Sequence, residues 1–395
     1  MKNKNTSQDF MKALSRLLHL LVIVLVCGGC NLPQTQDGLR IPVSLSKEDH
    51  VSIFDYVNKV ELVQLENLPE AMVADETVKD MVVIRDGFLL LDRRTFLIRM
   101  FGPDGKYIKT IDKVGRGHGE FPRAEALQVD EDGTLLVLSA TGGINRYDLR
   151  EGNAFIEHIP VEGGPVAIHH FMPLGGQEFL LFSASDPARV YFYDAEKAEA
   201  KAYFQEIPRW FSLSYYYDFQ ESPFYKRDGK AFFYTGCDGA VFQFDAETKE
   251  WRSALSWVIG DNSFDAHDVS QAEASVTNPA WKEIFDQKSN QAVLRLSRVN
   301  ESSRFVLASG VYRQEPVSLI YNKRNHSCVL FHKVKEEVLF RPRFTRDEIG
   351  YTLLSPENLS LYVNRAMLRD EHSRQIFDSA NEDSNSILVK YYWKK

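Results

Sequence analysis

Cysteine is scarce in this chain, and its scarcity limits the chemistry that the sequence supports. Four cysteines occur among 395 residues, and only Cys237 and Cys328 lie beyond the first thirty. These two thiols either pair in an oxidising compartment or are buried separately. Beyond the leader there is no Cys-x-x-Cys or His-Glu-x-x-His spacing and no Gly-x-Ser-x-Gly elbow. We therefore expect no metal, no cofactor and no recognisable catalytic residue.

Basic clusters and long apolar stretches are missing as well. The net charge is −8, and lysine and arginine form no stripe or patch, which excludes a nucleic-acid surface. After the leader, no apolar run approaches the ~18 residues of a membrane-spanning helix. The chain does contain 44% hydrophobic and 12% aromatic residues, with glycine turns spread along its length. This composition favours strands over helices and supplies a large core.

The first thirty residues form a leader of a different character. A basic segment precedes the apolar run 17–26, which is too short to cross a bilayer and is typical of a secretory signal. The sequence Cys27-Gly28-Gly29-Cys30 resembles a bacterial lipobox, so we predict a lipoprotein signal peptide over residues 1–29 and a lipid on Cys30. An ordinary signal peptide cleaved nearby is the alternative. A lipid on Cys30 anchors the chain to a membrane without spanning it.

A repeated pattern organises the rest of the chain. Each copy has an Asp-Gly turn, a short apolar strand, a polar turn and a further strand that ends in an aromatic residue. Four of these closing aromatics stand 46, 46 and 51 residues apart. They are Phe101, Tyr147, Tyr193 and Phe244. Several short strands within a period of this length predict the blades of a β-propeller.

Six repeats account for residues 51–395, so we predict one all-β domain, a six-bladed β-propeller with short helical insertions. The helices are expected at residues 279–288 and 364–377. The last strand, within residues 386–393, is expected to pair with the N-terminal strand at residues 60–65 and close the ring. Residues 30–50 are polar and lack a periodic pattern, which predicts a flexible tether.

The chain resembles the six-bladed β-propeller lipoproteins of Bacteroidota, relatives of the NHL-repeat propellers. The resemblance rests on the lipobox, on Asp104-Gly105-Lys106 after a strand, on the loop 115–121 and on the closing strand that starts at Asn385. His118 and Ser386 stand where the family usually has proline. The resemblance covers residues 50–395 and implies a fold and an envelope location, but no particular activity.

In this phylum, surface export is associated with an acidic run after the lipidated cysteine. Residues 31–37 lack such a run. We therefore expect attachment to the outer membrane with the periplasmic side favoured over the cell surface.

The glycine-rich loop 115–120 offers the first candidate binding residues. In the functional interpretation, Arg116 and His118 are presented at the mouth of the ring, and Arg123 follows shortly after the loop. In the structural alternative, the loop is a turn between blades whose glycines supply positive φ and close chain approach. A nucleotide-binding loop would need a strand before it and a helix after it, and here it joins two β-repeats.

Aromatic residues and a histidine pair complete the candidates. Tyr215 and Tyr216 lie beside the fourth repeat and Trp281 lies in a polar insertion, where their rings could contact a glycan or instead fill blade cores. His169 and His170 are adjacent on a predicted strand and point to opposite faces, so they are not expected to share a metal. We expect one of them to be packed and the other exposed.

Together these features favour a lipid-anchored binding or interaction module of the cell envelope over an enzyme. Its partner would be a glycan, a peptide or an envelope protein. The alternative is a metal-dependent hydrolase or lyase, similar to propeller lactonases, with its site in the central channel. A cluster of Asp, Glu and His on the innermost strands would distinguish the two.

Overall fold

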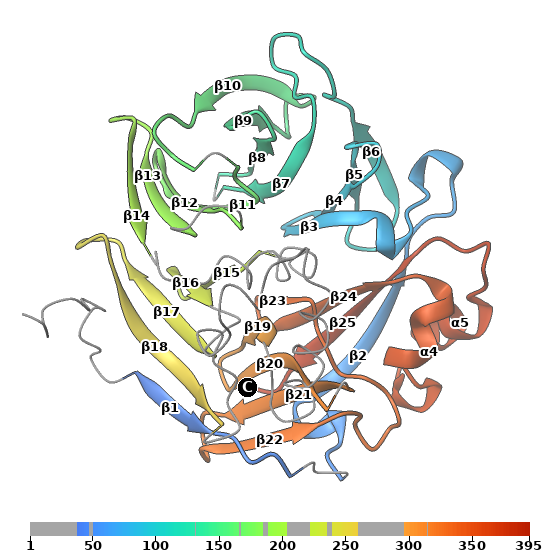
Figure 1. The fold of residues 1–395 in the computed structure, drawn as a ribbon. Helices are drawn as coiled ribbons and strands as arrows, with labels where there is room; N and C mark the ends of the chain where they lie inside the picture. Colours follow the sequence, from blue (N-terminus) through green and yellow to red (C-terminus); the bar gives the residue numbers. More distant parts are fainter. Residues whose placement is uncertain are drawn as a thin grey trace, which may run out of the picture.

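The computed structural model describes residues 38–46, 50–130, 132–165, 167–184, 189–203, 222–234, 239–259, 296–313 and 315–395. Their strands form six sheets arranged around a common axis, with the innermost strand of each sheet facing the centre of the ring (Figure 1). Five sheets have four strands and one has five. The predicted six-bladed β-propeller is therefore confirmed.

The first three blades follow the chain without interruption, each from its innermost strand outward. Blade 1 contains β3 (Val78–Ile84), β4 (Gly87–Asp92), β5 (Ile98–Phe101) and β6 (Tyr107–Ile111). Blade 2 contains β7 (Ala124–Val129), β8 (Thr134–Ser139), β9 (Gly143–Asp148) and β10 (Ala154–Pro160). Blade 3 contains β11 (His170–Gly175), β12 (Glu178–Phe182), β13 (Val190–Asp194) and β14 (Glu199–Tyr203).

The last three blades include the two places where the N-terminal part of the chain joins the ring. Blade 4 contains β15 (Phe224–Arg227), β16 (Lys230–Tyr234), β17 (Ala240–Asp245), β18 (Glu250–Val258) and β1 (Leu39–Pro42). Blade 5 contains β19 (Leu296–Glu301), β20 (Phe305–Tyr312), β21 (Glu315–Asn322) and β22 (Ser327–Phe331). Blade 6 contains β23 (Phe344–Arg346), β24 (Ile349–Leu354), β25 (Ile387–Trp393) and β2 (Val57–Gln64).

The apolar runs of the sequence lie on strands that are covered on both faces. Every residue of β4 is buried. Successive side chains of a strand point to opposite faces, so Leu89 and Leu91 join the core between blades 1 and 2, while Leu90 joins the core between blades 6 and 1. Six such cores occupy the six interfaces between blades. Each blade is therefore stabilised by its two neighbours.

The ring is closed by strands from both ends of the chain, as predicted. β2 pairs antiparallel with β25 and places Leu62 opposite Val389. The backbone N–H of Leu62 also donates a hydrogen bond of 3.1 Å to the Ser373 Oγ of helix α5 (Glu371–Ser379). Closure therefore combines a sheet with a helix that packs on its outermost strand.

The structure differs from the expected tether at its C-terminal part. β1 lies within residues 30–50 and pairs in parallel with β18, with Leu39 opposite Leu255. Ile41 is fully buried and packs in the same core as Trp257. Residues 39–42 are consequently part of blade 4, and the propeller begins before residue 51.

One predicted helix is divided in two, and the other lies outside the described residues. Within residues 364–377 a 3-10 turn, η7 (Arg365–Met367), is followed by α5. The predicted helix is interrupted at Asp370, because the Asp370 carboxylate accepts a hydrogen bond from the Ser373 N–H and caps a new helix there. The remaining short helices within the described ranges are η1 (Ile53–Asp55), η2 (Pro69–Ala71), η3 (Asp75–Thr77), η6 (Pro356–Asn358) and α4 (Leu359–Tyr362). None of the helices in the described ranges is long and apolar enough to span a bilayer.

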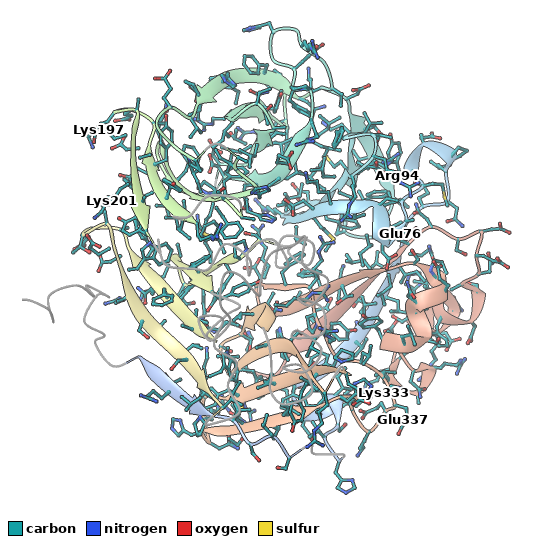
Figure 2. The ribbon with its side chains drawn as sticks, viewed as in Figure 1. Glu76, Arg94, Lys197, Lys201, Lys333 and Glu337 are labelled. Atoms are coloured by element: carbon teal, nitrogen blue, oxygen red, sulfur yellow. The ribbon has the colours of Figure 1, made fainter. Side chains whose placement is uncertain are left out.

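Charged side chains lie around the outside of the ring. Figure 2 shows Lys197 and Lys201 at the outer edge of blade 3, and Lys333 and Glu337 near the end of blade 5. The Lys201 ammonium lies 2.5 Å from the Glu250 carboxylate of blade 4. Such exposed pairs contribute little to stability, so the fold depends on the apolar cores between blades.

Candidate functional site

The innermost strands of neighbouring blades run in the same direction along the ring axis. Arg343, just before β23, donates a hydrogen bond of 3.3 Å to the backbone oxygen of Lys79 at the start of β3. Arg346, at the end of β23, donates to the backbone oxygen of Val83 near the end of β3. The starts of the innermost strands therefore meet at one mouth of the ring, and their ends meet at the other.

A cluster of charged side chains lies at the mouth where the innermost strands start. We call it the mouth cluster; its members are Lys79, Arg123, Glu125, His169 and Arg343. Glu125 is its centre, because one carboxylate oxygen accepts from Arg123 Nε at 2.7 Å and the other pairs with the Lys79 ammonium. The Glu125 side chain is only 8% exposed, whereas that of Arg123 is 56% exposed. A buried carboxylate thus holds an accessible guanidinium in place.

His169 adds a polar group of blade 3 to this cluster. Its Nδ1 accepts a hydrogen bond of 3.1 Å from the Ala184 N–H, which leaves Nε2 to carry the proton of the neutral ring. Burial lowers the pKa of His169, and the Glu125 carboxylate opposes that effect. His170 is buried, as expected for one of the pair, whereas His169 is half-buried and not exposed as expected for the other.

Asp80 connects the mouth cluster to the interface between blades 1 and 2. Its carboxylate accepts hydrogen bonds of 2.8 Å from the backbone N–H groups of Leu127 on β7 and of Met81. Burial raises the pKa of Asp80 to about 6, while these hydrogen bonds and the positive charge of Arg343 act in the opposite direction. Asp80 is therefore a titratable group at an interface between blades.

We expect Asp80 to make stability fall as the pH rises from 4 to 6. The folded pKa of about 6 lies above the ordinary value of 3.8, so the folded protein holds this proton more tightly than the unfolded chain. The stabilising contribution is complete below about pH 4 and is lost as the pH passes 6. Relative to Asp80→Asn, wild type should lose roughly 2–3 kcal/mol over this window, measured by urea unfolding at successive pH values.

Asp132→Asn provides a comparison of opposite sign. The Thr134 N–H donates to the Asp132 carboxylate at 3.0 Å and lowers its pKa. Its stabilising contribution is therefore lost as the pH falls. If the difference between wild type and Asp80→Asn did not change between pH 4 and 6, the role given to Asp80 would be wrong.

The structure places the predicted loop residues away from the mouth cluster. His118 packs edge-on against Phe155 of the outermost strand β10, with ring centroids 4.8 Å apart. Gly119 has a φ of +72°, and a Cβ there would lie 2.6 Å from the Phe155 ring. The Tyr147 hydroxyl donates to the Gly119 backbone oxygen at 2.9 Å. These contacts agree with the structural alternative, a turn between blades; Arg116 is exposed on the same turn.

Of the predicted binding residues that the structure describes, only Arg123 lies in the mouth cluster. Tyr215, Tyr216 and Trp281 lie outside the described residues, as do Cys30 and the signal peptide. Cys237 also lies outside them. Cys328 carries a free thiol, and burial raises its pKa to about 12.

Lys79, Glu125 and Arg343 were not predicted from the sequence. The available signal was a charged residue at the start of an apolar strand, as in Glu125 between Ala124 and Ala126. Within the ranges that the structure describes, no three His, Cys, Asp or Glu side chains are grouped to hold a metal ion. The observation that would favour a metal-dependent propeller enzyme is therefore not found among those residues.

The fold defines a six-bladed β-propeller with a charged cluster at one mouth of its ring. The chain belongs to a family described as a domain of unknown function, DUF4934, whose model matches residues 39–392. The match begins at the first residue of β1, which agrees with the inclusion of β1 in blade 4. No curated protein matches the chain.

Solved structures from Bacteroides share this fold. An inferred exported protein of Bacteroides fragilis superposes with a TM-score of 0.69 at 14% identity, over 91% of this chain and 100% of the other. A member of the DUF4221 family from Bacteroides vulgatus superposes with a TM-score of 0.51 at 10% identity, over 88% of this chain and 99% of the other. At these identities the similarity concerns the fold.

Proposed function

We propose that this protein is a binding module of the bacterial cell envelope, anchored by a lipid on Cys30, whose mouth cluster binds an acidic segment of a polypeptide partner. The observation that carries the proposal is the Arg123 guanidinium, more than half exposed and held by the buried Glu125. An arginine that is already fixed loses less side-chain entropy when it binds a carboxylate.

The charges of the mouth cluster favour an anionic ligand. Lys79 and Arg123 both contact Glu125, and Arg343 acts on the neighbouring Asp80 carboxylate, so three cations face two carboxylates. His169 is held toward its neutral form by burial. The exposed guanidinium of Arg123 can bind a carboxylate through two parallel hydrogen bonds, so a peptide carboxylate fits the mouth cluster.

Two observations support a location in the cell envelope: the leader sequence, and an exported protein with the same fold. A basic segment, a short apolar run and a lipobox-like sequence precede the propeller. One of the Bacteroides proteins with the same fold is an inferred exported protein. We therefore propose that the chain is a Bacteroidota propeller lipoprotein, related to NHL-repeat propellers, on the periplasmic side of the outer membrane.

An array of acidic, neutral and basic peptides tests the proposal. The purified protein should prefer acidic peptides, and the preference should weaken with added salt. Arg123→Gln should weaken binding about tenfold, because a charge-assisted hydrogen bond contributes roughly 1.5–3 kcal/mol. Circular dichroism would verify that the variant is folded.

Arg150→Gln is the matched control. Arg150 is exposed on the turn after β9 of the same blade and pairs with Asp148 at 3.4 Å, outside the mouth cluster. It should bind acidic peptides like the wild type. Equal losses in both variants, or no preference for acidic peptides, would show that the mouth cluster is not the binding site.

A further inference from the structure

A hollow of about 730 Å³ lies on the opposite face of the ring, over blades 5 and 6. It is bounded by the start of β2, the end of β25 and the turn between β23 and β24. The end of β23 lies at the end of β3, so this hollow and the mouth cluster are on opposite faces of the ring. The volume is within the ~300–1,000 Å³ of small-molecule sites.

Of the two carboxylates beside the hollow, one is hydrogen-bonded to the protein and the other is exposed to solvent. Both carboxylate oxygens of Glu348 accept from the Ser303 N–H, at 2.8 and 3.0 Å, and one accepts from the Ser303 hydroxyl at 2.7 Å. The Asp347 side chain is 86% exposed and lies 3.5 Å from Arg346. Neither carboxylate forms an ion pair with Arg304, which lines the same hollow.

Arg304 has an unused donor at this position. Its Nε is buried without a hydrogen-bond partner. Its guanidinium lies 5.1 Å from the centroid of the Phe305 ring, which supports one side of the group but accepts no N–H hydrogen bond in the plane of the guanidinium. The terminal guanidinium nitrogens of Arg304 are not buried in this way and form no hydrogen bond or ion pair with a described residue, so they can donate to a ligand in the hollow.

The side chains that line the hollow are positive on balance, with four cations (Lys59, Arg304, Lys394 and Lys395) and two carboxylates (Asp347 and Glu348). Lys59 is paired with Glu61 at 2.5 Å. Lys394 lines the hollow as well, and within the described part of the chain it forms no ion pair. Together with Arg304 it leaves two cations available to one anionic group.

The other lining groups suit a ligand that carries hydroxyls. Tyr392 has a partly exposed ring whose hydroxyl donates to Glu61 at 3.2 Å, and the amide of Asn58 lies at the same rim. An amphipathic ring beside amide and carboxylate groups can contact a sugar ring and its hydroxyls. Inorganic phosphate has no ring to lie against Tyr392, so it should bind less tightly than a saccharide that carries a carboxylate.

We propose that this hollow binds an acidic saccharide, with its carboxylate on Arg304 and its sugar ring against Tyr392. The site is separate from the mouth cluster and does not depend on it. Arg304 is preferred over Lys394 as the carboxylate partner because a guanidinium binds a carboxylate through two parallel hydrogen bonds.

Calorimetric titration with trigalacturonate tests the proposal, with maltotriose as a neutral comparison and inorganic phosphate as a second anion. We expect trigalacturonate to bind and the two comparisons to bind at least tenfold more weakly. Arg304→Gln should weaken trigalacturonate binding at least tenfold, and Lys394→Gln, which does not affect a buried group, should weaken it about threefold. Arg123→Gln in the mouth cluster should bind it like the wild type.

Arg313→Gln is the matched control, because the Arg313 guanidinium also lies 5.1 Å over a neighbouring ring, that of Tyr312, but outside the hollow. It should leave the titration unchanged. Equal binding of maltotriose, binding of phosphate alone, or no binding of trigalacturonate would overturn the proposal. Should Arg304→Gln fail to fold, an unchanged affinity in Lys394→Gln would also overturn it.

Discussion

Replacing Gly105 with alanine is expected to lower the free energy of unfolding by about 3–4 kcal/mol. Gly105 has a φ of +85°, and a Cβ there would lie 2.1 Å from the backbone oxygen of Gln64. Gln64 is the last residue of β2, the strand that closes the ring. A left-handed conformation costs a residue with a side chain about 1–2 kcal/mol, and overpacking adds about 1–3 kcal/mol. Urea unfolding of the two proteins measures the loss.

Gly133→Ala separates these two contributions. Gly133 follows Asp132 as Gly105 follows Asp104, and its φ is +88°, but no atom lies within 4 Å of the added Cβ. Only the conformational cost of about 1–2 kcal/mol should appear. Equal losses in the two variants would show that the approach of the blade 1 turn to β2 does not contribute to ring closure.

Asn385→Ala is expected to cost about 3–5 kcal/mol, also through ring closure. Asn385 is fully buried just before β25. Its Oδ1 accepts from Val73 N at 2.8 Å and from Ser386 N at 2.9 Å, and its Nδ2 donates to the backbone oxygens of Glu66 and Ala71, both at 2.9 Å. Alanine leaves four backbone groups without this partner, and each buried unsatisfied group costs about 1–3 kcal/mol.

Asn381→Ala is the control for the loss of an asparagine near this strand. Asn381 is exposed, and its side chain donates to the Ser379 oxygen at 3.1 Å and accepts from Asp383 N at 3.0 Å. Water can replace these bonds, so the cost should stay below about 1 kcal/mol. Limited proteolysis should cleave Asn385→Ala faster than Asn381→Ala. Comparable stability of the two variants would argue against a central role of Asn385.

The blade pattern could be predicted because each blade strand carries its own signal. The apolar run in β4 is buried on both faces, and the aromatic at the end of the third strand is buried in each of the first four blades, at Phe101, Tyr147, Tyr193 and Phe244. The closing partnership of β2 and β25 followed from the need to leave no long exposed edge. Local periodicity and one topological rule were therefore sufficient for the architecture.

β1 could not be predicted because its stability comes from tertiary contacts. Four residues, Leu39–Pro42, carry no alternation, and Pro42 weakens any local preference for a strand. Ile41 becomes buried only because β18 of blade 4 and its Trp257 are already in place. The division of the predicted helix 364–377 has a local cause: Asn364 and Asp370 each begin a separate turn.

The mouth cluster could be predicted only in part. Arg123 and Glu125 are two residues apart, but Lys79, His169 and Arg343 come from three other blades. Which residues meet at a mouth depends on the register of each innermost strand, and register is set by burial and turn geometry over the whole blade. His118 lies outside the mouth cluster because its ring packs against Phe155 of β10, a contact within the blade that follows the loop.

β1 also decides where a mechanical load on the N-terminal end of the propeller is carried. A lipid on Cys30 would transmit membrane motion through the residues that precede Leu39. That tension reaches the hydrogen bonds between β1 and β18 before it reaches β2. Under such a load, the four residue pairs between β1 and β18 would separate while β2 stays paired with β25. The pairing of the short parallel strand β1 would break first, and the pairing that closes the ring would stay intact.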